Sequence, residues 1–417
     1  MRVAIVTVAV LACAAPTFAA GGAPTFSKDV APILYKNCVE CHRASAMAPM
    51  SLLTYDEARP WARAIKQKVA SRQMPPWGAD PTVGKYSNDV SLKQADIDTI
   101  SAWADGGAPE GNRADLPAAP KFAEGWTIGK PDYVFKMQKP YNVPSDGTVP
   151  YIYVSIPTNL KDDIWIKAVE LKPTDRRVVH HIISSLVEGN GTTPSAEPAL
   201  TRDPARKEIG GGLGGLVPGR LYGEFEEGVA RKIPAGSVIV LQMHYTTIGT
   251  PVTDQTEIGV VLAKEPPANL RAQGGGAIPN MQFAIPPGDP NYEVVGRQKF
   301  DRDTYLSSLY PHMHVRGKDA TYSIIYPDGR EEVVLRVPKY DFNWQLSYKL
   351  AEPRFMPKGS TLKVTMHYDN SSGNRYNPDP TATVRWGEQT WEEMMLGYYG
   401  TLELPGSTAT RTRQRQQ

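Results

Sequence analysis

The N-terminal quarter of the chain carries apolar residues at helical spacing. The pattern predicts one helix over 29–35, a second after Pro60, and a third that opens at Ser91 with Gln94 completing a capping box. We therefore expect a small all-α domain over 21–111. The positions that would face its core are Val30, Ile33, Leu34, Trp61, Ile65, Val69, Ile97, Ile100 and Trp103.

The periodicity changes after a polar, Ala- and Pro-rich linker expected at 112–131. Short runs of β-branched and aromatic residues then alternate with turn residues, a pattern typical of β-sandwiches. We interpret the glycine-rich run 210–219 as a mobile loop, because it lacks the lysine and following helix of a phosphate-binding loop. The predicted strands are YIYVSI, IWIKAVEL, RVVHHIISSL, SVIVLQMHY, EIGVVLA, TYLSSLY, TYSIIYPDGREEVVLRV, TLKVTMHYD and MLGYYGTLEL.

An internal repeat indicates two similar β domains in tandem. Residues 233–247 (IPAGSVIVLQMHYTT) align without gaps to 356–370 (MPKGSTLKVTMHYDN), each with a P-x-G-S turn before a strand that ends in M-H-Y. We expect all-β sandwich, jelly-roll-like domains over 132–270 and 271–405. A disordered tail is expected at 406–417.

Composition excludes some partners and indicates export. The 417 residues include 46 Lys+Arg and 44 Asp+Glu, a balance that does not favour nucleic-acid binding. Residues 1–20 have the form of a secretory signal peptide, with Arg2, an apolar run and small residues before Gly21, rather than a lipoprotein signal ending at Cys13. No later stretch is long and apolar enough for a membrane span, so we expect a periplasmic or secreted protein.

The motif CVECH predicts covalent haem c. Cys38 and Cys41 are spaced so that each thiol can add to a haem vinyl group, while His42 ligates the iron. A zinc half-site and a redox C-x-x-C are the alternatives, but no second cysteine pair follows and the flanks are not βαβ.

Methionines near this motif are candidates for the sixth iron ligand. We favour Met74, whose thioether is placed by the stiff Pro75-Pro76 turn. Met47 and Met50 are closer to His42 in sequence and are the alternatives, with packing against the porphyrin as their other role.

The other six histidines all lie in the predicted β domains. His312 and His314 share one strand face and suit a single metal, whereas the adjacent His180 and His181 would need a bulge or different ring nitrogens to do so. Imidazole and thioether ligands without thiolates or carboxylates favour copper. Glu392 and Glu393 read as ordinary solvated or outer-shell groups, and no hydrolase motif is apparent.

These motifs resemble the copper type II monooxygenases, the family of the peptidylglycine α-hydroxylating and dopamine β-monooxygenases. The resemblance covers about 132–404 and rests on the order HH, QMH, HMHVRGK and EEMM. It implies two tandem β-sandwiches with one copper each. The implied ligands are His180, His181 and His244 for an electron-transferring copper, and His312, His314 and Met394 for an oxygen-activating copper.

The resemblance further implies hydroxylation of an aliphatic C–H bond with O2, with His312, His314 and Met394 at the catalytic copper. Gln242 also matches a family position near the first copper. The N-terminal segment is similar to cytochrome c domains that precede such β domains, so electrons are expected from a periplasmic donor through the haem, although ascorbate fills this role in the animal enzymes.

Four features depart from the family pattern or leave open which residues would bind the second copper. The mature chain has only Cys38 and Cys41, so the β domains lack the family's disulfides. Tyr310 stands where the peptide-amidating members carry a carboxylate-binding arginine, which argues against C-terminal glycine peptides as substrates. His367, the repeat counterpart of His244, and Met395, beside Met394, are further candidates for the second copper.

Two rival functions remain from the sequence. A periplasmic copper-binding electron carrier without turnover would need neither the H-x-H nor the downstream methionine, and both are present. Zinc in both β sites would leave the fused haem segment without a redox partner.

Overall fold

The computed structural model describes residues 22–402, apart from 45, 47, 123–124, 190, 192–193, 204, 217–222, 226–227 and 265–270. The expected signal peptide and tail lie outside the described residues. The chain is mostly β-sheet with few helices, which confirms the expected largely β protein. Among the described residues, no helix is both long enough and apolar enough to cross a membrane.

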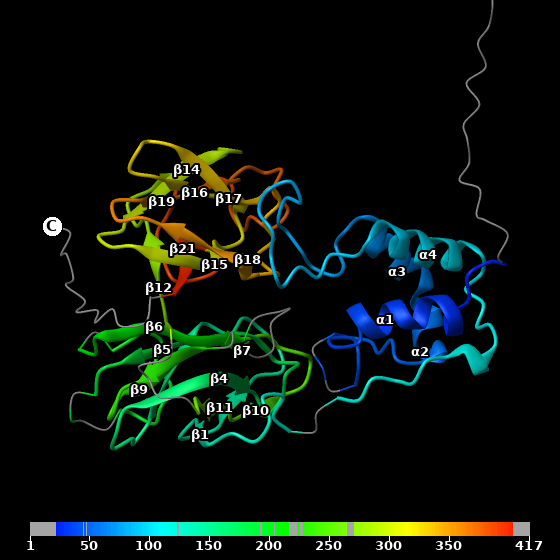
Figure 1. Cartoon of the computed structure of the whole chain (residues 1–417), viewed down its shortest axis with the longest axis horizontal. Helices are drawn as coiled ribbons and strands as arrows, with labels where there is room; N and C mark the ends of the chain where they lie inside the picture. The colour runs from blue at the N-terminus through cyan, green and yellow to red at the C-terminus, as the bar shows by residue number, and fades with distance from the viewer. Residues whose placement is uncertain are drawn as a thin grey trace, which may run out of the picture.

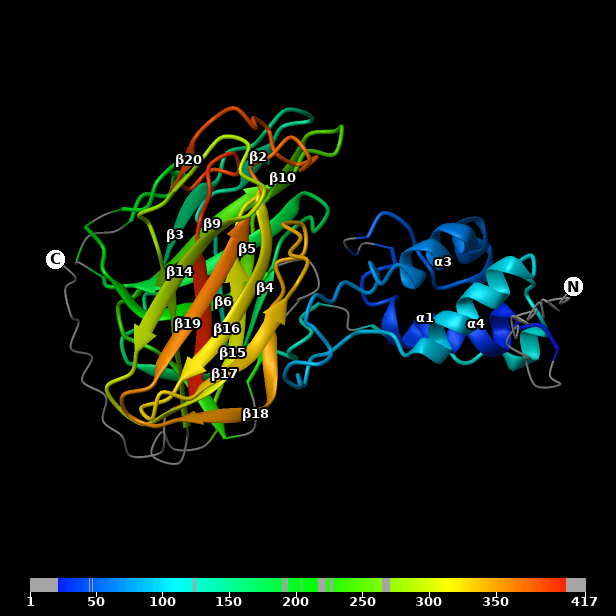
Figure 2. The same cartoon turned by 90° about the horizontal axis from the view of Figure 1, so that it is seen from above.

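The helices of the described residues lie in the N-terminal part, where they enclose a core of their own that includes Phe26, Leu34 and Trp103. Trp61, which was predicted to face this core, is instead 44% exposed. Figure 2 shows this helical unit beside the β region. Its elements are a π-helical turn Phe26–Val30, α1 Ala31–Asn37, α2 Tyr55–Ala58, a 3-10 turn Arg59–Trp61, α3 Ala62–Ala70, α4 Gln94–Asp105 and a 3-10 turn Arg113–Asp115.

The predicted start of the third helix is wrong. Helix α4 begins at Gln94, and Lys93 at its N-cap makes no side-chain cap, so Ser91 and Gln94 do not form a capping box. The capping box of this unit lies at α2, where Thr54 accepts from the Glu57 amide and the Glu57 carboxylate accepts from the Thr54 amide.

Two β-sandwiches follow, stacked one above the other in Figure 1. In the first, one core joins a sheet of order β1-β11-β4-β8 to a sheet of order β3-β9-β5-β6. Its strands are β1 Tyr133–Lys136, β2 Tyr141–Val143, β3 Ile152–Pro157, β4 Ile164–Lys172, β5 Val179–Val187, β6 Glu208–Leu216, β7 Gly223–Glu224, β8 Val229–Ile233, β9 Val238–Tyr245, β10 Val252–Asp254 and β11 Glu257–Leu262.

The second sandwich pairs β12-β21-β15-β18 with β14-β19-β16-β17 around a separate core. A short parallel pairing of β8 with β12 makes one continuous sheet through both sandwiches. The strands of the second sandwich are β12 Arg271–Pro279, β13 Ala284–Ile285, β14 Tyr292–Lys299, β15 Thr304–His312, β16 Gly317–Ile325, β17 Glu331–Val337, β18 Tyr348–Met356, β19 Thr361–Tyr368, β20 Val384–Arg385 and β21 Leu396–Leu402.

The glycine-rich run is not the loop we expected. Its described part lies in β6, which pairs with β5. A Cβ at Gly214 would meet the Val169 side chain at 3.1 Å, so the missing side chain lets β6 approach the opposite sheet of the sandwich.

An arm between α3 and α4 leaves the helical unit and packs on the second sandwich. Trp77 and Tyr86 lie against Tyr348, with ring centroids 5.0 and 5.6 Å from it. Asn88 donates to the Ser347 carbonyl and accepts from the Lys349 amide. Because β18 is the last strand of its sheet, this arm covers an edge that would otherwise be open.

Candidate metal centre between the two sandwiches

Three histidines of the first sandwich form one cluster. One ligand atom from each of His180, His181 and His244 lies within 4.8 Å of the others. The pairing of β5 with β9 shifts between Val179 and His181, so a bulge places both adjacent histidines next to His244. The adjacent histidines were expected to need either a bulge or ligation through different ring nitrogens, and the bulge is present.

The cluster lies on the face of β9 that points away from the core. Leu241, Met243 and Tyr245 are core residues, so alternation turns Gln242 and His244 to the opposite face. That face meets the second sandwich, and β6 contacts β12 there.

Burial keeps these imidazoles neutral. It lowers the pKa of His180 to about 4, with the Arg176 charge adding to the effect, and the pKa of His244 to about 3. The pKa of His181 is also lowered well below its usual range by burial and neighbouring imidazoles. Neutral imidazole is the protonation state that binds metals.

A second pair comes from the second sandwich. His312 ends β15 and His314 lies two residues beyond it, with ring centroids 5.3 Å apart. Met313 between them packs into the core. Burial lowers the pKa of His312 to about 4 and that of His314 to about 3, so this pair is also neutral.

Protein acceptors occupy one nitrogen of each ring in this pair. Nδ1 of His312 lies 2.7 Å from Oε1 of Gln345, and Nδ1 of His314 lies 3.1 Å from the Glu392 carbonyl. These acceptors require a proton on Nδ1, so Nε2 of each ring keeps its lone pair.

Glu393 holds the backbone of Met394 close to the backbone of His314. The carboxylate is fully buried and accepts from the backbone amides of His314 (2.8 Å), Arg316 (2.7 Å) and Met394 (3.3 Å). Burial raises the pKa of Glu393 to about 8. The interpretation of Glu393 as a solvated group is therefore wrong, whereas an outer-shell role agrees with its contacts.

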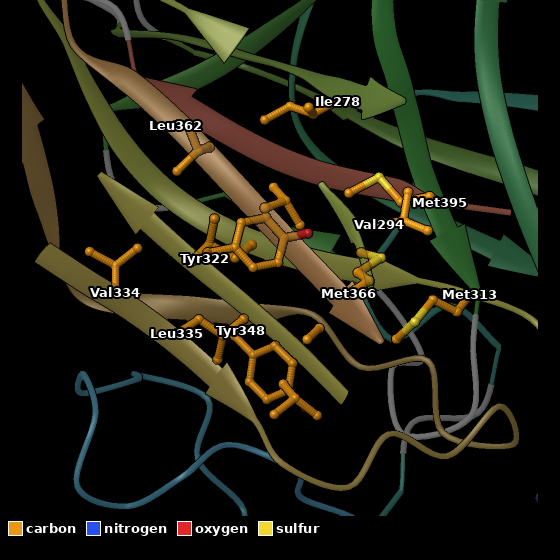
Figure 3. Packing of buried hydrophobic residues seen from close by; sticks show 14 of the residues in the cluster. Ile278, Val294, Met313, Tyr322, Val334, Leu335, Tyr348, Leu362, Met366 and Met395 are labelled. Carbon is orange, nitrogen blue, oxygen red and sulfur yellow. The ribbon is translucent and has the colours of Figure 1, made fainter. Parts of the chain in front are cut away.

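The neighbouring Met395 and the repeat histidine lie elsewhere. Met395 packs in the core of the second sandwich near Ile278 and Met366, as Figure 3 shows, whereas Met394 is buried outside that core cluster. His367 lies on β19, in the sheet away from the interface (Figure 1). Its ring nitrogens meet Asp319 at 2.7 Å and Glu293 at 3.5 Å.

Two aromatic rings connect the two histidine groups. The Tyr151 ring lies 4.6 Å from His244 and 6.5 Å from His314, measured between centroids. Phe342 stacks on His180 at 6.1 Å and lies edge-on to His314 at 6.0 Å. The two groups therefore belong to one interface that these aromatic rings help to fill.

Buried ring nitrogens in both groups lack partners among the described residues. These are Nε2 of His181, Nδ1 of His244 and Nε2 of His314. An unpartnered buried polar atom is costly, and a metal ion would satisfy a neutral imidazole lone pair. The residues present thus fit metal ions bound by nitrogen.

The CVECH motif forms a single turn after α1. The amides of Cys41 and His42 both bond to the Cys38 carbonyl, and both cysteines are free thiols. Nδ1 of His42 lies 3.3 Å from the Met50 carbonyl, which leaves Nε2 for a ligand role. The two free thiols and Nε2 of His42 are the groups that would hold a covalently attached haem.

The sixth-ligand candidates are only partly located. Met74 lines a cavity of about 310 Å³ together with Trp77, Leu92 and Ile97, and neither His42 nor the two cysteines line this cavity. Met50 packs against the helical core, and Met47 lies outside the described residues.

The motif also lies close to the first histidine cluster. The Arg176 guanidinium acts electrostatically on both the Cys41 thiol and the His180 ring, opposing the burial that raises the pKa of Cys41. The helical unit therefore approaches the first sandwich at the residues that precede β5.

Sequence reasoning missed most of the residues that support the site. Gln345, Tyr151 and Phe342 are distant in sequence from every histidine they contact. Only Glu393 carried a signal, because it adjoins Met394.

No protein-family model and no curated protein matches the chain. Solved structures with partial likeness include allantoicase from Saccharomyces cerevisiae, at 10% identity over 63% of this chain and 80% of that one with a TM-score of 0.18. A capsid structure of infectious bursal disease virus strain Gx has 11% identity, covers 66% and 73%, and has a TM-score of 0.20. PNGF-II has 9% identity, covers 67% and 66%, and has a TM-score of 0.26. Likeness this low does not assign a function.

Proposed function

We propose that the chain is an exported, haem c-linked, copper-dependent monooxygenase that hydroxylates an aliphatic C–H bond of a small molecule with O2. One observation carries the proposal: buried, neutral histidines from both sandwiches meet at one interface, and three of their ring nitrogens have no hydrogen-bond partner in the described part of the chain. Imidazole together with thioether ligands, without thiolate or carboxylate, favours copper over zinc or calcium.

The ligands would divide between the sandwiches. His180, His181 and His244 would hold one copper, and His312, His314 and Met394 the other. Copper at these positions supplies O2 binding and one-electron transfer. A thioether from Met394 favours the cuprous form, which binds O2.

The chain's own residues prepare the site. Gln345 and the Glu392 carbonyl orient the second pair of imidazoles, and Glu393 fixes the backbone on both sides of it. Tyr151 and Phe342 are apolar rings against the histidines, and they exclude water where reactive oxygen chemistry would occur.

The helical unit would act as a tethered cytochrome c-like electron donor. Cys38 and Cys41 would attach the haem, and His42 and Met74 would ligate its iron. Covalent tethering raises the effective concentration of the donor, which suits a reaction that needs two electrons per turnover. A periplasmic donor would reduce the haem.

The test measures metal content and oxygen uptake on the same exported, haem-loaded full chain. We expect two coppers per haem and O2 uptake that depends on a small C–H donor. Met394→Ile should lower product formation at least about 100-fold and leave the haem spectrum intact. The matched control is Met281→Ile, because the Met281 side chain is 58% exposed, whereas Met394 is 7% exposed.

Three results would contradict the proposal. Unchanged turnover in Met394→Ile would remove the assigned role of the thioether. Two coppers that only reoxidise the haem, without product from any donor, would favour the electron-carrier function. Zinc in place of copper would exclude redox chemistry at both β sites.

A further inference from the structure

A hydrogen-bond chain that is buried at Gln242 and Tyr153 and partly buried at Glu388 crosses from the first sandwich to the second. Nε2 of Gln242 donates to the hydroxyl of Tyr153 at 2.6 Å, and that hydroxyl donates to Oε2 of Glu388 at 2.9 Å. Gln242 and Tyr153 are 9% and 4% exposed, so solvent competes little for these bonds. Burial raises the pKa of Tyr153 to about 12, which keeps its proton available for donation.

The two ends of this chain belong to different histidine groups. Gln242 lies on β9 two residues before His244 and on the same face. Glu388 lies in segment 387–394, which ends at Met394. The chain therefore joins the strand that carries a ligand of the first group to the segment that carries a candidate ligand of the second.

Segment 387–394 has little regular structure of its own. It follows the short strand β20 and precedes β21, and its backbone bond from Gly387 to the Glu393 carbonyl closes it into a loop. Glu393 anchors one end to the backbone of His314 and Arg316, within the second sandwich. The other end is held across the interface by Tyr153.

We propose that Tyr153 is a positioning residue for the second metal site, contributed by the first sandwich. By holding Glu388 it fixes segment 387–394 in the conformation that presents Met394 beside His314. The second site is then complete only when the two sandwiches are closed on each other. The metal part of this inference rests on the proposed function, whereas the anchoring of the segment does not.

The test compares Tyr153→Phe with the wild type in the full chain. In metal-free protein, amide hydrogen exchange of 387–394 should accelerate at least about tenfold, because a partly buried bond to a charged acceptor is lost. In copper-loaded, chemically reduced protein, the copper–sulfur scattering in X-ray absorption should weaken while the histidine contribution persists.

Matched variants separate positioning from general damage. Glu388→Ala should reproduce both effects, and Glu388→Gln should restore most of the wild-type behaviour because its amide oxygen still accepts from Tyr153. Tyr133→Phe is the control, since Tyr133 is 40% exposed and lies on the distant edge strand β1.

The outcomes are distinguishable from failure of the proposed function. Unchanged exchange in Tyr153→Phe overturns the anchoring, and altered exchange with undiminished copper–sulfur scattering overturns the role in positioning Met394. If the wild-type protein itself lacks copper–sulfur scattering, the proposed second site fails, and the exchange comparison still decides whether Tyr153 anchors the segment.

Discussion

Gln345 illustrates how a single side chain prepares a ligand. It is 1% exposed, and its Oε1 atom accepts from both His312 and the Tyr310 hydroxyl. An acceptor at Nδ1 selects the tautomer whose Nε2 lone pair is free, and such partners commonly change metal affinity by one to two orders of magnitude.

Replacing Gln345 by Leu should therefore weaken copper binding at the second site about 10- to 100-fold, since the His312 ring loses its fixed tautomer. Competition titration with a cuprous chelator would measure this change. Tyr310→Phe is the control, because it removes the other bond to the same oxygen and leaves His312 in place. Wild-type affinity in Gln345→Leu would refute the role.

At the scale of single residues, the sequence pointed to the histidines as candidate ligands but not to the side chains that hydrogen-bond to them. Histidine is rare in this chain, and its spacing reports chemistry directly. Gln345 is one of many polar residues, and only the fold brings it to His312 across 33 residues. The choice between Met394 and Met395 as the candidate ligand likewise required the structure, because Met395 packs in the core and Met394 does not.

At the scale of the elements, departures from regular strand pairing place the candidate ligands. The bulge at His180 lets neighbouring residues share a face, and β15 ends at His312 so that His314 continues in an irregular segment. Strand patterns in a sequence predict alternation, but a bulge depends on pairing with a distant strand. The shared face of His312 and His314 was thus predictable from the sequence. For His180 and His181 the sequence predicted only that a bulge or different ring nitrogens would be needed.

Glu393 should be among the most costly residues to remove from the segment before β21. Glu393→Ala leaves buried amides of His314 and Arg316 without an acceptor, so we expect the free energy of unfolding to fall by roughly 3 kcal/mol or more. Urea denaturation of the metal-free protein measures this directly. Glu392 is partly exposed, so Glu392→Ala should lower the free energy of unfolding by less than about 1 kcal/mol. An equal loss of stability in the two variants would contradict the special position of Glu393.

The whole molecule determines which repeat histidine reaches the interface. The repeat places His244 and His367 at equivalent positions on β9 and β19, but the first sandwich turns the sheet of β9 towards its neighbour, whereas the second turns the sheet of β15. Sequence similarity between repeats does not encode this choice, which is why His367 remained a candidate until the sheets were placed.

The arm predicts that the helical unit stays bound without its covalent linker. If a protease site is inserted near Leu116, which is exposed, the cleaved fragments should co-elute in gel filtration. Trp77→Ala combined with Tyr86→Ala removes the aromatic contact with Tyr348 and should separate them. Trp61→Ala, at a 44% exposed tryptophan, should leave them together. Separation of the unaltered fragments would contradict the prediction.

The position of that arm also bears on how such a chain could arise and be re-engineered. Residues 77–88 lie inside the helical segment of the sequence, yet their aromatic rings belong to the surface of the second sandwich. The helical unit is consequently not an interchangeable cassette, because a foreign domain spliced in its place would bring no rings for Tyr348 and no cover for β18. Under the proposed function, the donor and acceptor units would therefore have to change together, and a graft would require the arm as well as the CVECH motif.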